Sequence, residues 1–198
     1  MKILSFVDMH GSLSVLKKLK QKAKNVDIIL CAGDFTIFEQ GIEHFLSAFN
    51  KLKKPVLMIH GNHEEEGLLR RACEEYKNIF FLHKNHFVQE DILFLGWGGG
   101  GFSQTDKEFE KHSKKLKKLM EKHKEKAIVL ITHAPPYKTK LDMIFKEHHG
   151  NKSIRTFIKE NKIDLSFSGH LHENNNQQDK INKSTVINPG PYGRIINI

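Results

Sequence analysis

Apolar residues follow two different spacings along the first part of the chain. The runs 2–7, 26–32 and 55–60 are short and nearly continuous in apolar residues, which is typical of strands covered on both faces of a sheet. Between them, over 13–23 and 42–52, apolar residues recur every three or four positions, as on one face of a helix. The pattern predicts alternating strands and helices and therefore an α/β fold.

Capping and breaking residues agree with these boundaries. Ser12 is a suitable N-cap for the first helix, and Pro55 prevents the second helix from running into the third strand. A third helix is expected from about 65 to 76.

The pattern changes after residue 78. The short runs 79–82, 87–89 and 92–95 have no helix between them and predict an antiparallel segment. The remaining elements are expected as a helix over 107–126, a strand over 127–131, a loop over 135–150, a helix capped by Asn151, and strands over 163–167, 184–187 and 194–198. The polar tract 174–179 is expected to be a loop.

Length and composition predict a single globular domain over residues 1–198. Hydrophobic residues make up 38% and charged residues 28%, a balance that excludes a disordered chain. No apolar run reaches the roughly 20 residues of a membrane span, and none is typical of a signal peptide. Cys31 and Cys73 lie far apart without metal or redox spacing, so we expect reduced core thiols in a cytoplasmic protein.

The chain is basic, but its charge does not identify a partner. Its 32 Lys and Arg against 23 Asp and Glu give a net charge of +9. The densest lysine run, 107–126, contains one apolar stripe at helical spacing, which favours a solvated helix over a nucleic-acid surface. A positive field would equally attract small anionic substrates. Nucleic acid therefore stays an alternative that we do not favour.

Candidate chemistry lies directly after the apolar strands. Right-handed parallel crossovers bring such strand ends to one edge of a sheet, where buried acids and histidines need a compensating partner. Oxygen and imidazole nitrogen donors together suit Mn, Fe, Zn, Co or Ni. Five strand ends carry these side chains, which are Asp8, His10, Asp34, Asn62, His63, His133, His170 and His172.

The ordered set of motifs resembles the calcineurin-like metallophosphoesterases. The motifs are Asp-x-His at 8–10, Gly-Asp at 33–34, Gly-Asn-His-Glu at 61–64, Thr-His at 132–133 and Gly-His-x-His at 169–172. Each alone is weak evidence, but their order after successive strands is specific, and they cover nearly the whole chain. The resemblance implies a two-sheet β-sandwich flanked by helices, in four αββα layers.

The resemblance also implies the roles of the site residues. Two divalent ions, with Mn first among the candidates, would support in-line attack of a metal-bridging hydroxide on a phosphodiester or, less favoured, a phosphomonoester. His63 would be the general acid for the leaving group, although the stretch after Asp34 shows no acidic residue to orient it. One ion would be held by Asp8, His10 and His172, the other by Asn62, His133 and His170, and Asp34 would bridge them.

Other residues receive smaller roles. The loops 98–104 and 135–150 are expected to line the substrate pocket, where Tyr137 and either His148 or His149 would contact substrate. Thr132 and Glu173 are expected to orient the ligands. Arg155 is interpreted as solvated or salt-bridged, and His60 as a core or supporting residue. We expect surface positions for His44, His112 and His123, and no role for His83 or His86.

Two other functions fit the same residues. A nuclease of this fold would use the basic charge for binding DNA or RNA, and would bind it in a salt-dependent way. A non-catalytic metal-binding scaffold would keep the fold without turnover, which the intact ligand set and His63 disfavour. The substrate, the native metals and a homo-oligomeric state stay open.

Overall fold

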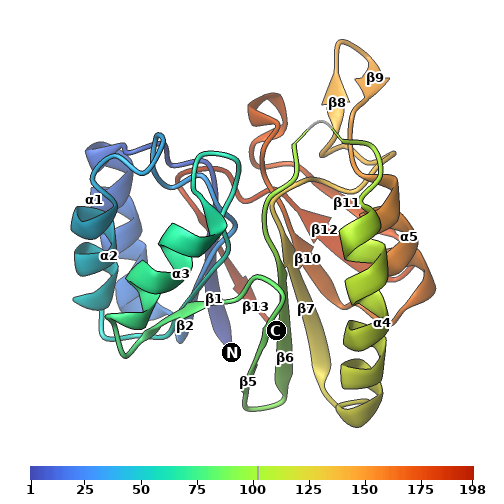
Figure 1. Cartoon of the computed structure of the whole chain (residues 1–198), viewed down its shortest axis with the longest axis horizontal. Coiled ribbons are helices and arrows are strands. Elements are labelled where there is room, and N and C mark those ends of the chain that lie inside the picture. Colours follow the sequence, from blue (N-terminus) through green and yellow to red (C-terminus); the bar gives the residue numbers. More distant parts are fainter. Residues whose placement is uncertain (102) are drawn as a thin grey trace.

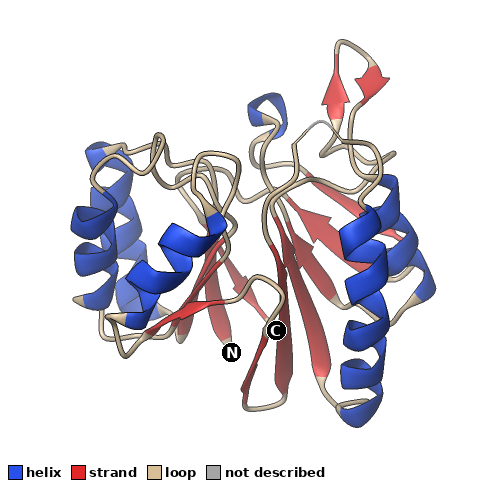
Figure 2. Cartoon of the chain, in the orientation of Figure 1, coloured by secondary structure: helices blue, strands red, loops and turns tan. Residues whose placement is uncertain are grey.

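Two β-sheets lie face to face in the computed structural model, which describes residues 1–101 and 103–198, and helices cover the outer face of each sheet (Figures 1 and 2). The first sheet, sheet A, has the strand order β13-β1-β2-β3-β4. The second, sheet B, has the order β11-β12-β10-β7-β6-β5. The predicted two-sheet sandwich flanked by helices is confirmed.

Sheet A is parallel except at one edge. Its strands are β1 (Lys2–Phe6), β2 (Ile28–Cys31), β3 (Val56–Met58), β4 (Ile79–Phe81) and the antiparallel edge strand β13 (Arg194–Asn197). The helical segments that follow its first three strands are α1 (Leu13–Lys22), η1 (Ala23–Asn25), α2 (Ile42–Asn50) and α3 (Glu66–Glu74). The three α-helices pack on one face of the sheet, as expected for parallel crossovers (Figure 1).

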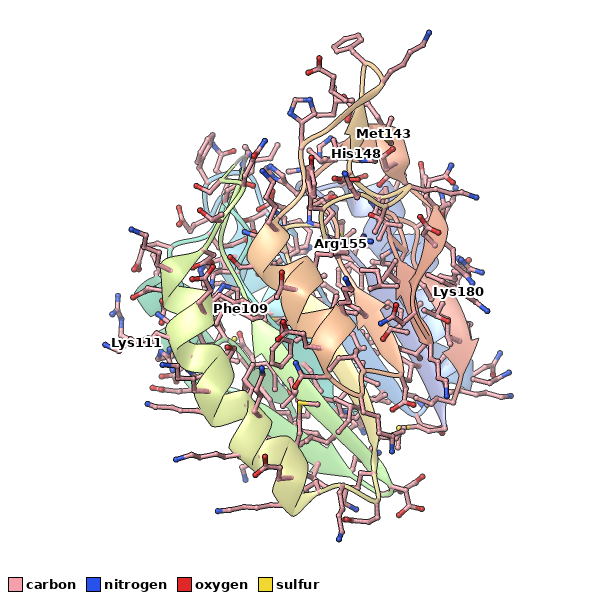
Figure 3. The ribbon with its side chains drawn as sticks, turned by 90° about the vertical axis from the view of Figure 1, so that its right-hand side faces the viewer. Phe109, Lys111, Met143, His148, Arg155 and Lys180 are labelled. Atoms are coloured by element: carbon pink, nitrogen blue, oxygen red, sulfur yellow. The ribbon has the colours of Figure 1, made fainter. Side chains whose placement is uncertain are left out.

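Sheet B has a parallel centre and antiparallel edges. Its strands are β5 (His86–Gln89), β6 (Ile92–Trp97), β7 (Ala127–Thr132), β10 (Leu165–Phe167), β11 (Gln178–Ile181) and β12 (Ser184–Ile187). Helices α4 (Lys107–Lys122) and α5 (Lys152–Glu160) cover its outer face, as the view in Figure 3 shows. A small hairpin of β8 (Met143–Ile144) and β9 (Glu147–His148) stands apart, and a short helix η2 (His172–Asn174) follows β10.

Successive side chains of a strand point to opposite faces of the sheet and so belong to different hydrophobic cores. In β2, Ile28 and Leu30 face the other sheet, whereas Ile29 and Cys31 face the helices. The inner core between the sheets also includes Phe94, Phe167 and other apolar residues of both sheets, and separate cores lie under the helices of each sheet. Strands covered on both faces explain the continuous apolar runs of the sequence.

The predicted caps form. The Ser12 hydroxyl accepts a hydrogen bond from the Val15 N–H at 3.4 Å, and the Asn151 amide oxygen accepts one from the Ile154 N–H at 3.0 Å. An N-cap of this type contributes about 1 kcal/mol. The caps fix the beginnings of α1 and α5, each of which follows a loop with site residues.

Three expectations after residue 78 were wrong. The segment 79–95 is not one antiparallel unit, because β4 pairs in parallel with β3 of sheet A and only β5 and β6 form an antiparallel pair. The polar tract 174–179 is not entirely a loop, because β11 begins at Gln178 at the edge of sheet B, where its polar residues are exposed or partly exposed. The loop 135–150 contains the β8–β9 hairpin.

No helix in the described ranges 1–101 and 103–198 combines the length and the apolar character needed to cross a bilayer.

Candidate metal centre

The candidate residues gather where the two sheets meet. The loops after β1, β2 and β3 come from sheet A, and the loops after β7 and β10 come from sheet B; all lie at the upper end of the sandwich in Figure 2. The expectation of a single sheet edge was therefore wrong, because the five strands are divided between two sheets. Their carboxyl ends instead face one another across the inner core.

One group contains Asp8, His10 and His172. Nε2 of His10 lies 3.0 Å from Nε2 of His172, and the latter atom lies 3.9 Å from Oδ2 of Asp8. Potential ligand atoms of the three residues all lie within 4.8 Å of one another. Oδ1 of Asp8 is buried and has no hydrogen-bond partner within the described residues. Two converging imidazole nitrogens and an unsatisfied buried carboxylate oxygen fit a divalent cation.

The second group contains Asn62, His133 and His170. Oδ1 of Asn62 lies 3.0 Å from Nε2 of His133 and 2.9 Å from Nδ1 of His170. Nδ1 of His133 lies 2.8 Å from the Ala32 carbonyl oxygen, which can only accept a hydrogen bond. The Nδ1 atom therefore carries the hydrogen, and Nε2 faces the cluster, as in a metal-binding histidine.

Asp34 joins the two groups. Its potential ligand atoms lie within 4.8 Å of those of His10 and His63, and also of those of Asp8 and His133. Oδ2 is 3.4 Å from Nε2 of His133, and Oδ1 accepts a hydrogen bond of 2.9 Å from the His63 N–H. This buried carboxylate is thus adjacent to both sets of candidate ligands.

Burial and charge strongly perturb the ionisation of the cluster. Burial alone would raise the pKa of Asp34, but the hydrogen bond and charge of His133 outweigh it and lower that pKa to about 2. Burial would lower the pKa of His133, but Asp34 raises it to about 9. Burial raises the pKa of Asp8 to about 6, and burial together with the charge of His133 lowers the pKa of His170 to about 4. Such opposed shifts are typical of functional sites.

The backbone is strained at the candidate ligands. Asp8, His10, Asp34 and His170 have φ values of 53°, 45°, 51° and 71°, in the left-handed region that non-glycine residues seldom adopt. Gly61, which precedes Asn62, lies so close to Asp34 that a Cβ at this position would overlap Oδ1 of Asp34, so only glycine fits here. The strained loops turn the ligand side chains toward one another.

Sequence reasoning missed the role of Glu64. Its buried carboxylate accepts hydrogen bonds from the N–H groups of Asp34 (2.9 Å) and Gly61 (3.0 Å) and from both the N–H and the hydroxyl of Thr36 (2.9 and 2.7 Å). The loops after β2 and β3 are therefore held by a single side chain. The signal was present, since Glu64 completes the motif Gly61-Asn62-His63-Glu64.

His63 lies beside these groups. Its ring centroid is 4.8 Å from that of His10 and 4.6 Å from that of Phe38. Nδ1 has no hydrogen-bond partner among residues 1–101 and 103–198, so within these ranges no carboxylate orients the ring through that atom. Phe38, not an acid, lies against it.

A further cluster of His60, Glu66 and His83 cannot bind a metal through His83. The Gly98 N–H donates to Nδ1 of His83 at 2.7 Å, so in the neutral ring Nε2 carries the hydrogen and faces Oε2 of Glu66 at 3.3 Å. Burial lowers the pKa of His83 to about 3, which keeps the ring neutral. His83 was given no role from sequence, but it is a buried structural residue. His60 is buried beside it, as expected.

The rim differs from expectation at two residues. Arg155 is partly exposed and forms no ion pair within the described residues, and its Nη1 donates to the carbonyls of Tyr137 (2.7 Å) and Lys138 (2.8 Å). His112 was expected at the surface and is only partly exposed there, because its ring packs against that of Trp97, with 5.4 Å between the centroids.

The β8–β9 hairpin stands next to the cluster, and in Figure 3 its residues Met143 and His148 lie above α5. The Asn174 amide donates to the Met143 carbonyl at 3.0 Å, which ties the hairpin to the loop carrying His172. The hydroxyl of Thr132 donates to the Ala134 carbonyl across the turn that carries His133, and Glu173 is exposed. The expected pocket loop 98–104 includes residue 102, which lies outside the described residues.

Comparison with known proteins agrees with this arrangement. The sequence profile of the calcineurin-like phosphoesterases matches residues 1–174. The protein MJ1162 of Methanocaldococcus jannaschii is 32% identical over 206 residues, which cover 96% of this chain and 88% of that protein.

Solved structures show the same fold at low sequence identity. TT1561 of Thermus thermophilus superposes with a TM-score of 0.77 at 17% identity, covering 96% of this chain and 89% of that one. A dimetal phosphatase from Danio rerio superposes with a TM-score of 0.65 at 10% identity, covering 94% and 86%. The match of the family profile to most of the sequence, together with these likenesses, shows that the chain belongs to the calcineurin-like phosphoesterase family.

Proposed function

We propose that the protein hydrolyses a phosphodiester with two divalent cations bound at the facing strand ends. The observation that carries this proposal is the buried carboxylate of Asp34, whose oxygens lie next to both groups of candidate ligands. Asp8, His10 and His172 would hold one cation, Asn62, His133 and His170 the other, and Asp34 both. Residues 1–198 would act as one domain, since the two sheets share the inner core.

The donor atoms of the candidate ligands limit which metal ions would bind. Carboxylate oxygens and imidazole nitrogens together suit borderline divalent ions, so we propose Mn first, with Fe, Zn, Co and Ni as alternatives. When bound, such ions supply Lewis-acid stabilisation of phosphoryl charge and a water of lowered pKa.

The chain's own residues would orient the ester and supply a proton. His63 lies beside the ligand His10 but belongs to neither of the two ligand groups, so we assign it the general acid that protonates the departing oxygen. Asn62 would fix the position of His63 through the backbone while its amide oxygen faces His133.

We propose a diester rather than a monoester because the residues that we assign to the site include no arginine. A monoester carries a second negative charge, for which an arginine fork is a favourable partner. Arg155 instead donates to two backbone carbonyls. The preference is tested by comparing bis(p-nitrophenyl) phosphate with p-nitrophenyl phosphate on the Mn-loaded protein.

The role of His63 is tested by the dependence of His63→Asn on the leaving group. We expect kcat/KM to fall by roughly 10²–10⁴-fold on an alkyl ester, and by much less on a p-nitrophenyl ester, because nitrophenolate departs with little help from an acid. Metal content should stay at two ions per chain. His86→Asn, at an exposed position on β5, is the matched control. Equal losses on both esters, or loss of a metal, would exclude His63 as the general acid.

A further inference from the structure

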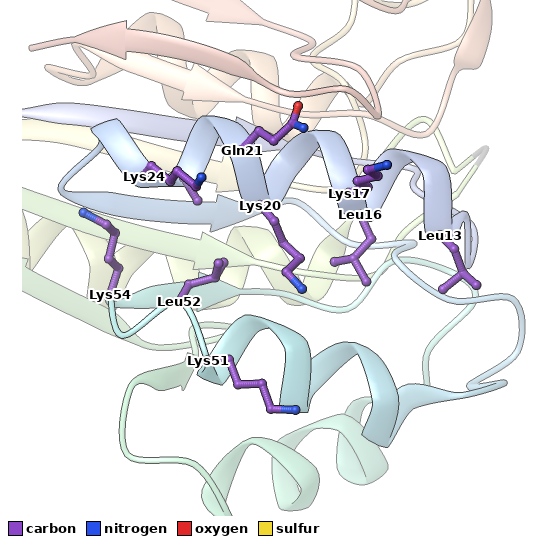
Figure 4. Close-up of a pocket in the computed structure, with 10 residues that line it drawn as sticks. Leu13, Leu16, Lys17, Lys20, Gln21, Lys24, Lys51, Leu52 and Lys54 are labelled. Carbon is purple, nitrogen blue, oxygen red and sulfur yellow. The ribbon is translucent and has the colours of Figure 1, made fainter.

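A basic groove lies between α1 and the end of α2, on the helical layer of sheet A. Its volume is about 530 Å³, within the range of small-molecule sites. Leu13, Leu16 and Leu52 form an apolar floor, and Figure 4 shows lysines around it on α1, on η1 and on the segment that follows α2. Leu13 is 63% exposed, so part of this floor is open to a ligand.

The groove concentrates positive charge. Five lysines line it, and no acidic residue does; they are Lys17, Lys20, Lys24, Lys51 and Lys54. The ammonium group of Lys54 donates to the Val26 carbonyl. Across residues 1–101 and 103–198, the other four form no ion pair with a carboxylate.

This arrangement is electrostatically unfavourable on its own. Lys17 and Lys20 lie three residues apart on α1, where like charges at this spacing destabilise the helix, and Lys24 adds a third positive charge from the following segment η1. Helix α1 contains no acidic residue to offset them. Lys51 on the opposite side adds charge of the same sign. An anion between the helices would relieve this repulsion.

We propose that the groove binds a small anionic amphiphile, a molecule with an acidic head group and an unbranched apolar chain. The lysines would receive the head group, and the leucine floor would receive the chain. A concave floor does not suit the surface of a bilayer, and none of the described residues that line the groove is aromatic, so they offer no ring on which bases could stack. The groove contains none of the proposed metal ligands, so the proposal is independent of the phosphoesterase activity.

The test uses 1-decanesulfonate below its micelle-forming concentration, titrated calorimetrically into the metal-loaded protein. Methanesulfonate carries the head group alone, and 1-decanol carries the chain alone. We expect one saturable site for decanesulfonate and much weaker binding of both fragments. Chemical shifts should change at residues 13–24 and 51–54. Equal affinity for methanesulfonate, or uptake of many molecules without saturation, would overturn the proposal.

Variants locate the site. Lys17→Gln/Lys20→Gln/Lys51→Gln should weaken decanesulfonate binding at least about tenfold. The matched control Lys114→Gln/Lys118→Gln/Lys122→Gln, on exposed positions of α4, should bind as the wild type does. Leu13→Ser should weaken decanesulfonate binding without affecting methanesulfonate. Phosphoesterase activity should be unchanged in all three variants. Equal affinity of the wild type and the groove variant would overturn the proposal.

Stability gives a second readout. Lys17→Glu places a carboxylate three residues before Lys20 and outside the last turn of α1, so it should raise the melting temperature of the protein without ligand and abolish binding. An unchanged or lower melting temperature with binding retained would contradict the proposed repulsion. Anionic vesicles and a single-stranded oligothymidylate are included as probes. Lysine-dependent binding to either, without binding of decanesulfonate, would refute the amphiphile and indicate the other partner.

Discussion

Two histidines of the candidate metal centre differ in how much protein surrounds them. His133, in one ligand group, is fully buried, and both of its ring nitrogens face protein groups within 3.0 Å. The side chain of His172, in the other group, is 54% exposed, and its described contacts are with His10 and Asp8. His133 is therefore fixed before a cation arrives, whereas His172 is accessible to solvent and substrate.

This difference separates two tasks. A preorganised set of ligands loses little side-chain freedom on binding and should hold its ion more tightly. An exposed set leaves room for a phosphate oxygen and for His63 beside it. We infer that His133 is the most firmly placed of the candidate ligands and that His172 is the one most easily displaced.

Changing the residue shared by both ligand groups should have the largest effect. Asp34→Asn removes the charge next to both ligand groups, so we expect both ions to be lost and activity to fall at least about 10³-fold. Metal analysis and kcat/KM, measured in parallel, check this outcome. Asp91→Asn, at a fully exposed position, is the control. A variant that keeps one tightly held ion would show that Asp34 serves only one ligand group.

A smaller effect is expected for Glu64→Gln, which changes only the hydrogen bonds that hold the loops after β2 and β3. The amide NH₂ group would face backbone N–H donors, leaving buried groups unpaired at a cost of about 1–3 kcal/mol. Supporting residues of this kind typically change metal affinity or activity by about 10–100-fold. Thermal unfolding and metal titration are the measurements. Glu74→Gln, on the exposed face of α3, should match the wild type.

The metal-free protein should lose stability as the pH rises from 7 to 9. Asp34 raises the pKa of His133 from 6.5 to about 9, so its contribution is complete below pH 6.5 and is lost as the pH passes through about 9. The shifted groups Asp8, His60, His83 and His170 titrate below this window, with pKa values of about 6, 4, 3 and 4.

Bound metal should reverse this trend, because metals bind the deprotonated ring and so gain affinity with pH. Melting temperatures with chelator and with Mn, measured across the window, check both signs. The variant His133→Asn should show no decline with chelator. A decline that persists in this variant would assign the effect to another group.

The smallest effect is expected at the β8–β9 hairpin, beside the loop that carries His172. The two residues of the β8–β9 turn, Phe145 and Lys146, have φ values of 47° and 71°, which is the conformation preferred by Asn-Gly. Phe145→Asn/Lys146→Gly should therefore stabilise the protein by about 1 kcal/mol, or about 2–4 °C in melting temperature. Lys138→Gly, at another positive φ beside the hairpin, is a comparison with one residue changed. A lower melting temperature would mean that Phe145 stabilises the turn through contacts of its own.

Patterns in the sequence predicted most helices and strands and the candidate site residues. Continuous apolar runs indicated the strands, the caps Ser12 and Asn151 indicated the beginnings of two helices, and the ordered motifs indicated the candidate ligands. Local spacing could not assign the strands to two sheets. β4 and β5 follow each other along the chain, but β4 pairs with β3 in sheet A and β5 pairs with β6 in sheet B. The roles of Glu64 and His83 depend on backbone N–H groups of distant loops, which no spacing rule reveals.

Glu64 also determines where this chain can change length. One carboxylate holds Gly61 and Thr36, so an inserted or deleted residue within 34–36 or 61–64 would withdraw a donor and displace a candidate ligand. Helix α2 lies between these two segments along the chain, makes no contact with the Glu64 carboxylate, and packs on the outer face of sheet A. Whole helical turns could therefore be added or removed there while both loops keep their contacts. Length variation among related chains is therefore expected in α2 and excluded from the two short motifs.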